Sequence, residues 1–196
     1  MTRKLLSLLL AAVLLIAPCL SLAEEYLTYT DGSLSFIYPG DWMLLSRDNI
    51  DEILDAAATV DEVGAMVESA RAQIEQYGMI VLMSADGADN INILLQDAGA
   101  ELTGDDLLAL APSISESIAG SIEGTTFNDP EIIDINGAEA LMLQYAYTLA
   151  GIGFNGVQVY LPFGAELAVC TLTSSAEDMS AGAETLGVVL GSMQLQ

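Results

Sequence analysis

The side chains of this chain that could do chemistry are almost all carboxylates. The sequence holds 28 Asp and Glu, only 4 Lys and Arg, and no His. Nucleophilic sites of the Ser-His-Asp and Cys-His kinds need a histidine base, and phosphoryl-transfer sites need cations beside the phosphates. Zinc prefers His and thiolate ligands. We therefore assign no catalytic, cofactor-binding or metal-binding residues from the sequence, and we expect a protein that is not an enzyme.

A pair of carboxylates is the enzymatic alternative that the composition leaves open. Glycosidases place two Asp or Glu on either side of a sugar, and no spacing in this sequence selects such a pair. A small carboxylate-dependent hydrolase acting on extracellular glycans is therefore one alternative. Trp often lines such clefts, but the only one, Trp42, follows two predicted strands beside Pro39 and is predicted to lie in the core.

One acidic segment has the donor atoms of a calcium site. Residues 86–92 read Asp-Gly-Ala-Asp-Asn-Ile-Asn, and calcium takes six to eight hard oxygen ligands. The D-x-D-x-D-G spacing is missing because Ala88 stands where a ligand would be. An Asp- and Asn-rich β-turn explains the segment equally well, so a calcium-stabilised surface protein is a second alternative.

Residues 151–156 match the pattern G-x-G-x-x-G. A dinucleotide-binding loop with this pattern must lead into a helix whose amino end faces the pyrophosphate. Here the apolar, strand-like residues Val157 to Leu161 follow instead. The pattern therefore predicts a hairpin connection, in which glycine allows positive φ.

The first 23 residues have the three parts of a signal peptide. Arg3 and Lys4 form a basic start, the apolar run at 5–17 is too short to span a bilayer, and Ala23 ends a small-residue cleavage site. Lipidation at Cys19 is an alternative, although Pro18 stands where Gly, Ala or Ser normally precedes the lipidated Cys. We expect an exported protein, secreted or at the cell surface or periplasm, with no integral membrane segment after cleavage.

Cleavage would leave the 28 acids against only Arg47 and Arg71. Nucleic acids and anionic membranes are disfavoured as partners, because they are bound through Lys and Arg. A basic protein partner fits this charge, and so does an acidic surface that only maintains solubility. Cys170 would be the only remaining Cys, and its apolar surroundings predict a buried thiol.

Hydrophobic periodicity predicts one α+β domain over residues 24–196. The expected strands come in runs joined by short turns, which implies a mainly antiparallel sheet with helices packed on it. Strands are predicted at 26–30, 34–38, 79–83, 91–95, 131–135, 141–149, 157–161 and 166–173. Helices are predicted at 48–58, at 59–77, from 103 to about 122 with a kink or a split at Pro112, and after an N-cap at Ser175.

Three groups of residues, in this order along residues 26–196, resemble the PsbP-like domain family. The first is the opening Gly32, Phe36, Tyr38-Pro39 and Trp42, the second is the segment 135–140 before a tyrosine-bearing strand, and the third is the closing strand and helix that end in Gly-Ser-Met at 191–193. The family includes the photosystem II extrinsic subunit, a Ran-binding nuclear-import factor and DcrB-type exported proteins of bacteria. The resemblance implies an α-β-α sandwich.

The resemblance implies no chemistry, because members act as binding or assembly subunits on unlike partners. The metal-associated His residues of the photosynthetic members have no counterpart in a chain without His. The sequence therefore predicts an exported, non-enzymatic binding or interaction module whose partner it does not identify.

Overall fold

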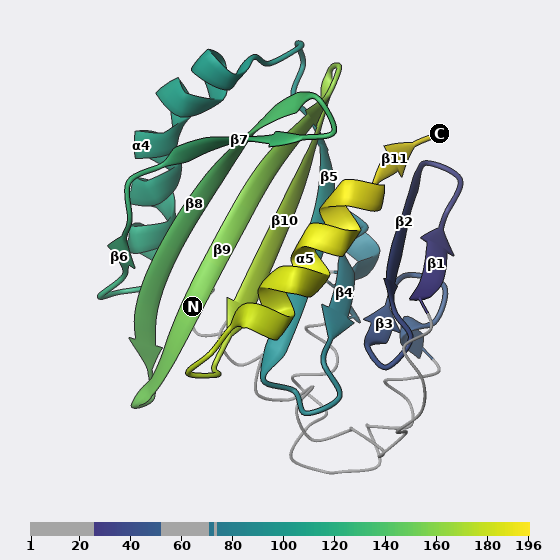
Figure 1. Ribbon diagram of the computed structural model, residues 1–196, viewed down its shortest axis with the longest axis horizontal. Helices are drawn as coiled ribbons and strands as arrows, with labels where there is room; N and C mark the ends of the chain where they lie inside the picture. Colours follow the sequence, from purple (N-terminus) through teal and green to yellow (C-terminus); the bar gives the residue numbers. More distant parts are fainter. Residues whose placement is uncertain (1–25, 52–70, 73) are drawn as a thin grey trace.

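The computed structural model describes residues 26–51, 71–72 and 74–196 (Figure 1). The predicted signal peptide, Cys19 and most of the two helices predicted between residues 48 and 77 lie outside the described residues. The described residues that border this second segment, 50–51, 71–72 and 74–77, are helical.

An antiparallel sheet of eight strands forms the centre of the molecule (Figure 1). The strand order is β3-β4-β5-β10-β9-β8-β6, and β7 pairs with another part of β8. The strands are β3 (Met43–Leu45), β4 (Ile80–Met83), β5 (Asp89–Asp97), β6 (Thr126–Phe127), β7 (Glu131–Ile135), β8 (Ala138–Leu149), β9 (Ile152–Phe163) and β10 (Glu166–Ser174). The fold is of the α+β class, as predicted.

Local turn chemistry sets two of the hairpins in this sheet, β7–β8 and β8–β9. Asn136 and Gly137 both have positive φ, 55° and 88°, which is the backbone that an Asn-Gly hairpin turn requires. The β8–β9 hairpin turns at Ala150 and Gly151, where φ is 53° and 85°. The hairpin connection predicted for the glycine-rich segment is confirmed at Gly151, whereas Gly153 and Gly156 lie within β9 and do not have positive φ.

Helix α4 (Gly104–Ser121) covers one face of the sheet beside β8. Thr103 caps it, since the Thr103 hydroxyl accepts from the Asp106 amide and the Asp106 carboxylate accepts from the Thr103 amide. Leu107 packs with Leu141 and Leu143 of β8. The predicted split at Pro112 is wrong: the helix runs through this residue, which is exposed, so water can solvate the carbonyl that a proline leaves unpaired.

Helix α5 (Ser180–Ser192) lies on the other face, against β10 and β5. The predicted N-cap at Ser175 is wrong. The helix begins one turn later, after Met179, which makes no side-chain cap. The Ser175 amide instead donates to the Ala88 carbonyl at 2.9 Å, which holds the loop before α5 on the turn between β4 and β5.

A second sheet joins the two ends of the described chain. It contains β1 (Tyr26–Thr30), β2 (Leu34–Pro39) and β11 (Gln194–Leu195), in the order β1-β2-β11, and α5 also packs against β2. The two sheets share one core, which contains Phe36 and, as predicted, Trp42. None of the described helices is long and apolar enough to cross a membrane.

Candidate functional site

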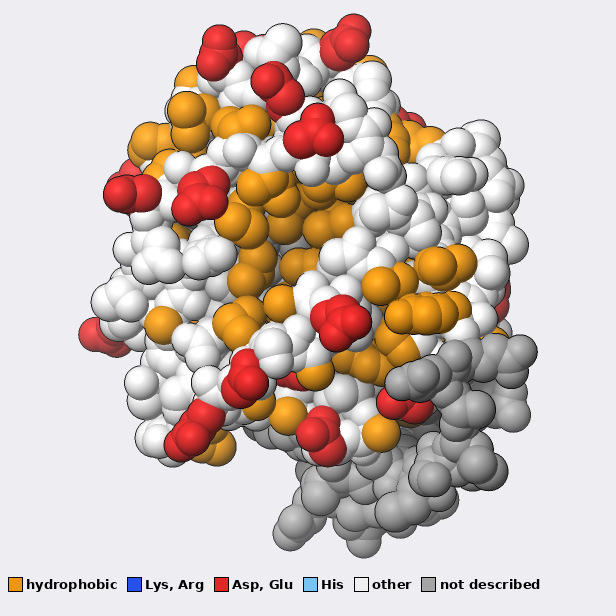
Figure 2. Space-filling view, viewed as in Figure 1, with side chains coloured by type: hydrophobic (Ala, Val, Ile, Leu, Met, Phe, Trp, Pro, Cys, Tyr) orange, Lys and Arg blue, Asp and Glu red, His pale blue; other side chains and the backbone are white. Residues whose placement is uncertain are grey.

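An apolar strip lies on the α5 side of the sheet, between β7 and α5 (Figure 2). Alternation along the strands puts every second side chain of β8 and β9 on this side, and α5 itself packs over β10 and β5. We call this surface the α5–β7 strip. It consists of Ile133, Ala140, Met142, Val157, Val159 and Leu161.

The strip is closed at one end and open at the other. The Asn136 side-chain amide in the β7–β8 turn donates to the Gly191 carbonyl in the last turn of α5 at 2.7 Å. This contact ties β7 to α5 at the closed end. Ile133 and Met142 are half-buried, while Val159 and Leu161 beneath them are buried.

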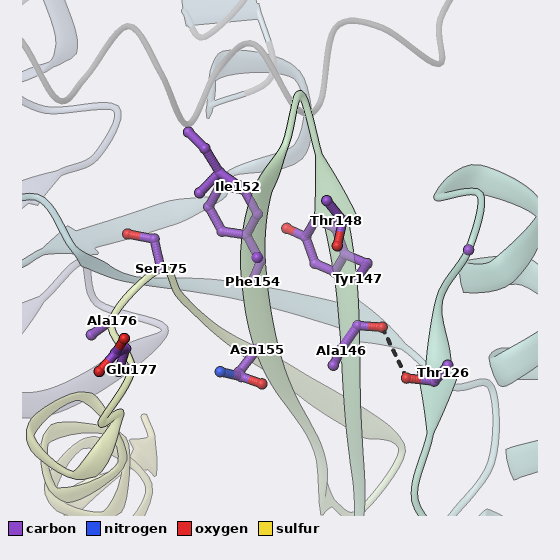
Figure 3. Close-up of a pocket in the computed structure, with 12 residues that line it drawn as sticks. Thr126, Ala146, Tyr147, Thr148, Ile152, Phe154, Asn155, Ser175, Ala176 and Glu177 are labelled. Carbon is purple, nitrogen blue, oxygen red and sulfur yellow. Dashed lines mark hydrogen bonds between the residues drawn. The ribbon is translucent and has the colours of Figure 1, made fainter.

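At the open end the surface becomes a polar hollow of about 540 Å³ (Figure 3). It lies at the tip of the β8–β9 hairpin, beside β6 and the loop that leads into α5. Its lining includes Thr126, Ala146, Thr148, Asn155, Ser175 and Glu177.

Four strand pairings place a row of short, mostly polar side chains across this end of the sheet. The row runs Asp89–Ser174–Asn155–Ala146–Thr126, each residue paired in register with the next. Asp89, Ser174, Asn155 and Ala146 lie on the α5 side, because each is two, four or six positions from a residue of the apolar core along its strand. Thr126 lies on the same side through its pairing with Ala146. The apolar strip therefore ends in groups that donate and accept hydrogen bonds.

The hollow is equipped for hydrogen bonding. The Thr126 hydroxyl already donates to the Ala146 carbonyl at 3.3 Å (Figure 3), and the Ser175 hydroxyl donates to the Ala88 carbonyl at the same distance. Glu177 is the one carboxylate among the described residues that line the hollow. These residues can orient a polar ligand, but they do not form the carboxylate pair that glycoside hydrolysis uses.

Asp89, at the inner end of the polar row, is an unusual group. It is only 6% exposed, and its Oδ1 atom has no hydrogen-bond partner. Its carboxylate lies against Gly182 in the first turn of α5. That end of a helix carries partial positive charge, which helps to offset the cost of burying a carboxylate.

Both described cations lie away from the strip. The Arg47 guanidinium donates to the Glu75 carbonyl at 2.6 Å and to the Ile74 carbonyl. Arg71 pairs with Asp51 at 2.9 Å. Among the described residues, the charged side chains on β7, on α5 and in the loop before α5 are all acidic, namely Glu131, Asp134, Glu177, Asp178 and Glu184.

The potential nucleophiles of the sheet are buried rather than activated. Cys170 is fully buried, as predicted, and burial raises the pKa of its thiol to about 12. Burial likewise raises the pKa of Tyr160 to about 12 and raises the pKa of Tyr145. Tyr145 belongs to an aromatic cluster with Phe127 and Tyr147, so it serves packing on the α4 side of the sheet.

The segment considered for calcium forms the turn between β4 and β5. Asp86 Oδ1 accepts from the Ala88 amide at 3.0 Å and from the Ser84 hydroxyl at 2.7 Å, and these hydrogen bonds lower the pKa of Asp86. The turn chemistry alone accounts for this geometry. The described part of the chain brings no three His, Cys, Asp or Glu together as metal ligands.

The comparisons with known proteins bear on the fold. Neither the protein-family models nor the curated proteins give a match to this chain. A solved cyanobacterial PsbP from Synechocystis sp. PCC 6803 is 14% identical to it, with a TM-score of 0.53 over 91% of this chain and 98% of that one. The fold is PsbP-like.

A structure from Bacteroides thetaiotaomicron agrees with this conclusion. It is 13% identical, with a TM-score of 0.51 over 83% of this chain. The match covers only 45% of the Bacteroides chain, so this chain spans less than half the length of that protein. At these identities the likeness concerns the fold, and it confirms the resemblance that the PsbP-like sequence pattern predicted.

Proposed function

We propose that this protein is an exported, non-enzymatic binding module that engages a basic protein partner through the α5–β7 strip and the polar hollow. The observation that carries the proposal is a strip with the half-buried Ile133 and Met142 at its surface, whose charged neighbours on β7, on α5 and in the loop before α5 are all acidic. Apolar contact supplies affinity, and carboxylates beside it select a partner with positive charge.

The composition supports a role in binding rather than catalysis. The chain has no His, and its single Lys lies at position 4 in the predicted signal peptide, so the usual proton shuttles and nucleophile activators are missing. The PsbP-like resemblance agrees with this, since it implies binding or assembly subunits. That part of the argument is an analogy of fold.

A charge-neutralisation experiment tests the binding surface. The immobilised protein is exposed to the solubilised cell envelope of its source at low and high salt, and captured proteins are identified. We expect capture of a basic protein that falls as ionic strength rises. The triple variant Glu131→Gln, Glu177→Gln, Glu184→Gln should no longer capture this protein.

The matched control removes the same number of charges on the α4 side, through Glu101→Gln, Asp105→Asn and Glu116→Gln. This control should retain capture. Equal loss in both triple variants would show that only overall charge matters, and capture that ignores salt would contradict an electrostatic contact.

Export is tested separately, because it rests on the sequence of residues 1–23. We expect the protein purified from its source to begin at Glu24, as mass spectrometry of the intact chain would show. A lipid-modified chain that begins at Cys19 would establish the lipoprotein alternative, and an uncleaved chain in the cytoplasm would contradict export.

A further inference from the structure

Strand β1 is an exposed outer edge of the second sheet. The strand order β1-β2-β11 leaves one side of β1 without a neighbouring strand (Figure 1). Four of its five residues are exposed, among them Tyr26 at 51% and Leu27 at 44%. An edge of this kind presents backbone N–H and C=O groups that can pair with a further strand.

The hydrogen bonds of β2 establish which way the backbone groups of Thr28 point. In an antiparallel pair of strands, residue pairs that exchange hydrogen bonds alternate with pairs that do not. The Ile37 amide donates to the Ser192 hydroxyl at 2.9 Å, on the side of β2 that faces β11. Ile37 is the register partner of Thr28. The backbone N–H and C=O of Thr28 therefore point away from β2, out of the sheet.

The same alternation applies along the whole of β1. The Asp31 amide donates to the Leu34 carbonyl at 3.3 Å in the β1–β2 turn, which agrees with the phase found at Thr28. Tyr26 and Thr30, two positions to either side, therefore also direct their backbone groups outward. Within the described ranges, no residue hydrogen-bonds to these outward groups.

The other sheet edges of the described chain are protected in ways that β1 is not. Proteins guard edge strands by making them very short or by placing charges and proline on them. Strands β3, β6 and β11 have only two or three residues each. Strand β7 carries Glu131 and Asp134, and Pro130 precedes it. Strand β1 reads Tyr-Leu-Thr-Tyr-Thr, which favours a strand and contains neither charge nor proline.

We infer that β1 pairs antiparallel with β1 of a second copy of this chain, around a two-fold axis at Thr28. The outward-pointing residues are spaced evenly about Thr28, so Thr28 faces Thr28 of the second copy and Tyr26 faces Thr30. Each of these pairs exchanges two N–H···O=C hydrogen bonds. The three-stranded sheets of the two copies then form one continuous sheet. The inference goes beyond the proposed function, because it concerns a different surface.

The side chains of β1 favour a second copy over a foreign strand. The two-fold arrangement puts Leu27 opposite Tyr29 of the second copy, in a pair without hydrogen bonds, where side chains lie closest. Leu27 is 44% exposed in the single chain, and Tyr29 belongs to the core on the same side of the strand. Aromatic and aliphatic side chains opposite each other stabilise a sheet. No charge on β1 selects a foreign sequence.

Charge makes the dimer weak and gives it a distinctive dependence on salt. The chain has a net charge of −24, Asp31 follows β1, and two Glu precede it in the sequence. Like charges oppose association, and salt screens them. Dimerisation should therefore strengthen as ionic strength rises, whereas capture of a basic partner should weaken. The contact of five residues a side is small beside the roughly 20–30 of a standard interface, so we expect a transient dimer.

Sedimentation equilibrium of the protein purified from its source tests the dimer, at concentrations from about 10 μM to about 1 mM, the range in which weak complexes dissociate. The average mass should rise from monomer toward dimer, and at lower concentration in high salt. Thr28→Pro removes the outward N–H and places a proline ring at the edge, and it should raise the dissociation constant at least about tenfold. Thr28→Val keeps the N–H and should dimerise like the wild type.

Hydrogen exchange tests the same contact on the unaltered chain. At low concentration the Thr28 amide should exchange rapidly, while the Leu27 and Tyr29 amides, bonded to β2, are protected. At high concentration exchange at Thr28 should slow as the dimer forms. This measurement decides the matter even if Thr28→Pro fails to fold.

Two results would overturn the inference: a chain that stays monomeric throughout the concentration range at high salt, or a dimer in which the Thr28 amide still exchanges rapidly. Protection of Thr28 by a different protein, without dimerisation, would show a foreign strand as the occupant and would equally rule out the second copy. Envelope capture depends on other residues, so Thr28→Pro should leave it unchanged, and either proposal can fail without the other.

Discussion

The carboxylate of Asp89 lies directly over Gly182 in the first turn of α5. A Cβ atom added at Gly182 would stand 2.9 Å from the Asp89 Cγ and 2.9 Å from the Leu172 Cδ1. Glycine therefore lets the amino end of α5 settle onto the buried ends of β5 and β10. This relationship fixes the height of α5 above the sheet.

We expect Gly182→Ala to destabilise the protein by about 1–3 kcal/mol, the usual cost of overpacking a close contact. Urea unfolding followed by circular dichroism measures it. Gly187→Ala is the matched control in the same helix, where a Cβ meets open space. There alanine should be stabilising by about 0.5–1 kcal/mol, and equal effects at the two positions would contradict the packing argument.

A second close approach holds the aromatic cluster on the other face of the sheet. A Cβ at Gly156 would overlap the Tyr145 ring, which packs between Phe127 and Tyr147 with ring centroids 5.7 and 6.3 Å away. Gly156→Ala should therefore destabilise the fold by about 1–3 kcal/mol. Near-ultraviolet circular dichroism should also change as the tyrosines move, whereas Gly153→Ala, with open space, should leave that spectrum unaltered.

The β1–β2 turn should give the protein an acid-sensitive component of stability. Burial acts to raise the pKa of Asp31, but hydrogen bonds from the Leu34 amide, the Ser33 amide and hydroxyl, and the Tyr29 hydroxyl outweigh it, so the pKa is lowered. The ionised carboxylate thus stabilises the folded state fully above its ordinary unfolded pKa of about 3.9. This contribution is lost as the pH falls through the lower, folded pKa.

A comparison of wild type with Asp31→Asn tests the direction of this pH dependence of stability. The stability difference, measured by urea unfolding at several pH values, should be largest near neutrality and shrink at acidic pH. Asp41→Asn removes an exposed carboxylate just after β2 and serves as the control. A difference that is constant from neutral pH to about pH 2 would show that ionisation of Asp31 is irrelevant.

Cys170 should report global unfolding. It is fully buried in the middle of β10, and burial raises the pKa of its thiol to about 12, so the reactive thiolate is scarce and inaccessible. In a Cys19→Ser background, where it is the single thiol, labelling by a thiol reagent should be negligible until denaturant unfolds the chain. Rapid labelling of the folded protein would reveal local opening of β10.

Features that depend on neighbouring residues in the sequence were predictable. The Asn136-Gly137 hairpin and the Thr103 cap follow from short-range backbone chemistry. The cap at Ser175 failed because the loop contact with Ala88 competes with capping. Strand β11 has two residues and owes its existence to pairing with Ser35 and Leu34, which no local pattern encodes.

The candidate site was not predictable for a related reason. The polar row from Asp89 to Thr126 depends on four strand pairings at once, and a shift of one residue in any of them would move side chains to the other face. The sequence does carry the composition of the site, since the excess of acids was evident. That polar residues lie together at one end of the sheet follows from the register of the strand pairings, which cannot be read from the sequence.

Arg47 and Arg71 both lie in the segment 46–77, but eight Asp and Glu of the same segment outnumber them, so this part of the chain is net acidic as well. A cationic molecule diffusing nearby is therefore attracted to this segment as it is to the acidic remainder of the chain. Long-range guidance of this kind speeds encounter without adding a single contact to the final complex. It predicts an association rate constant, more than a dissociation rate constant, that declines when salt is added.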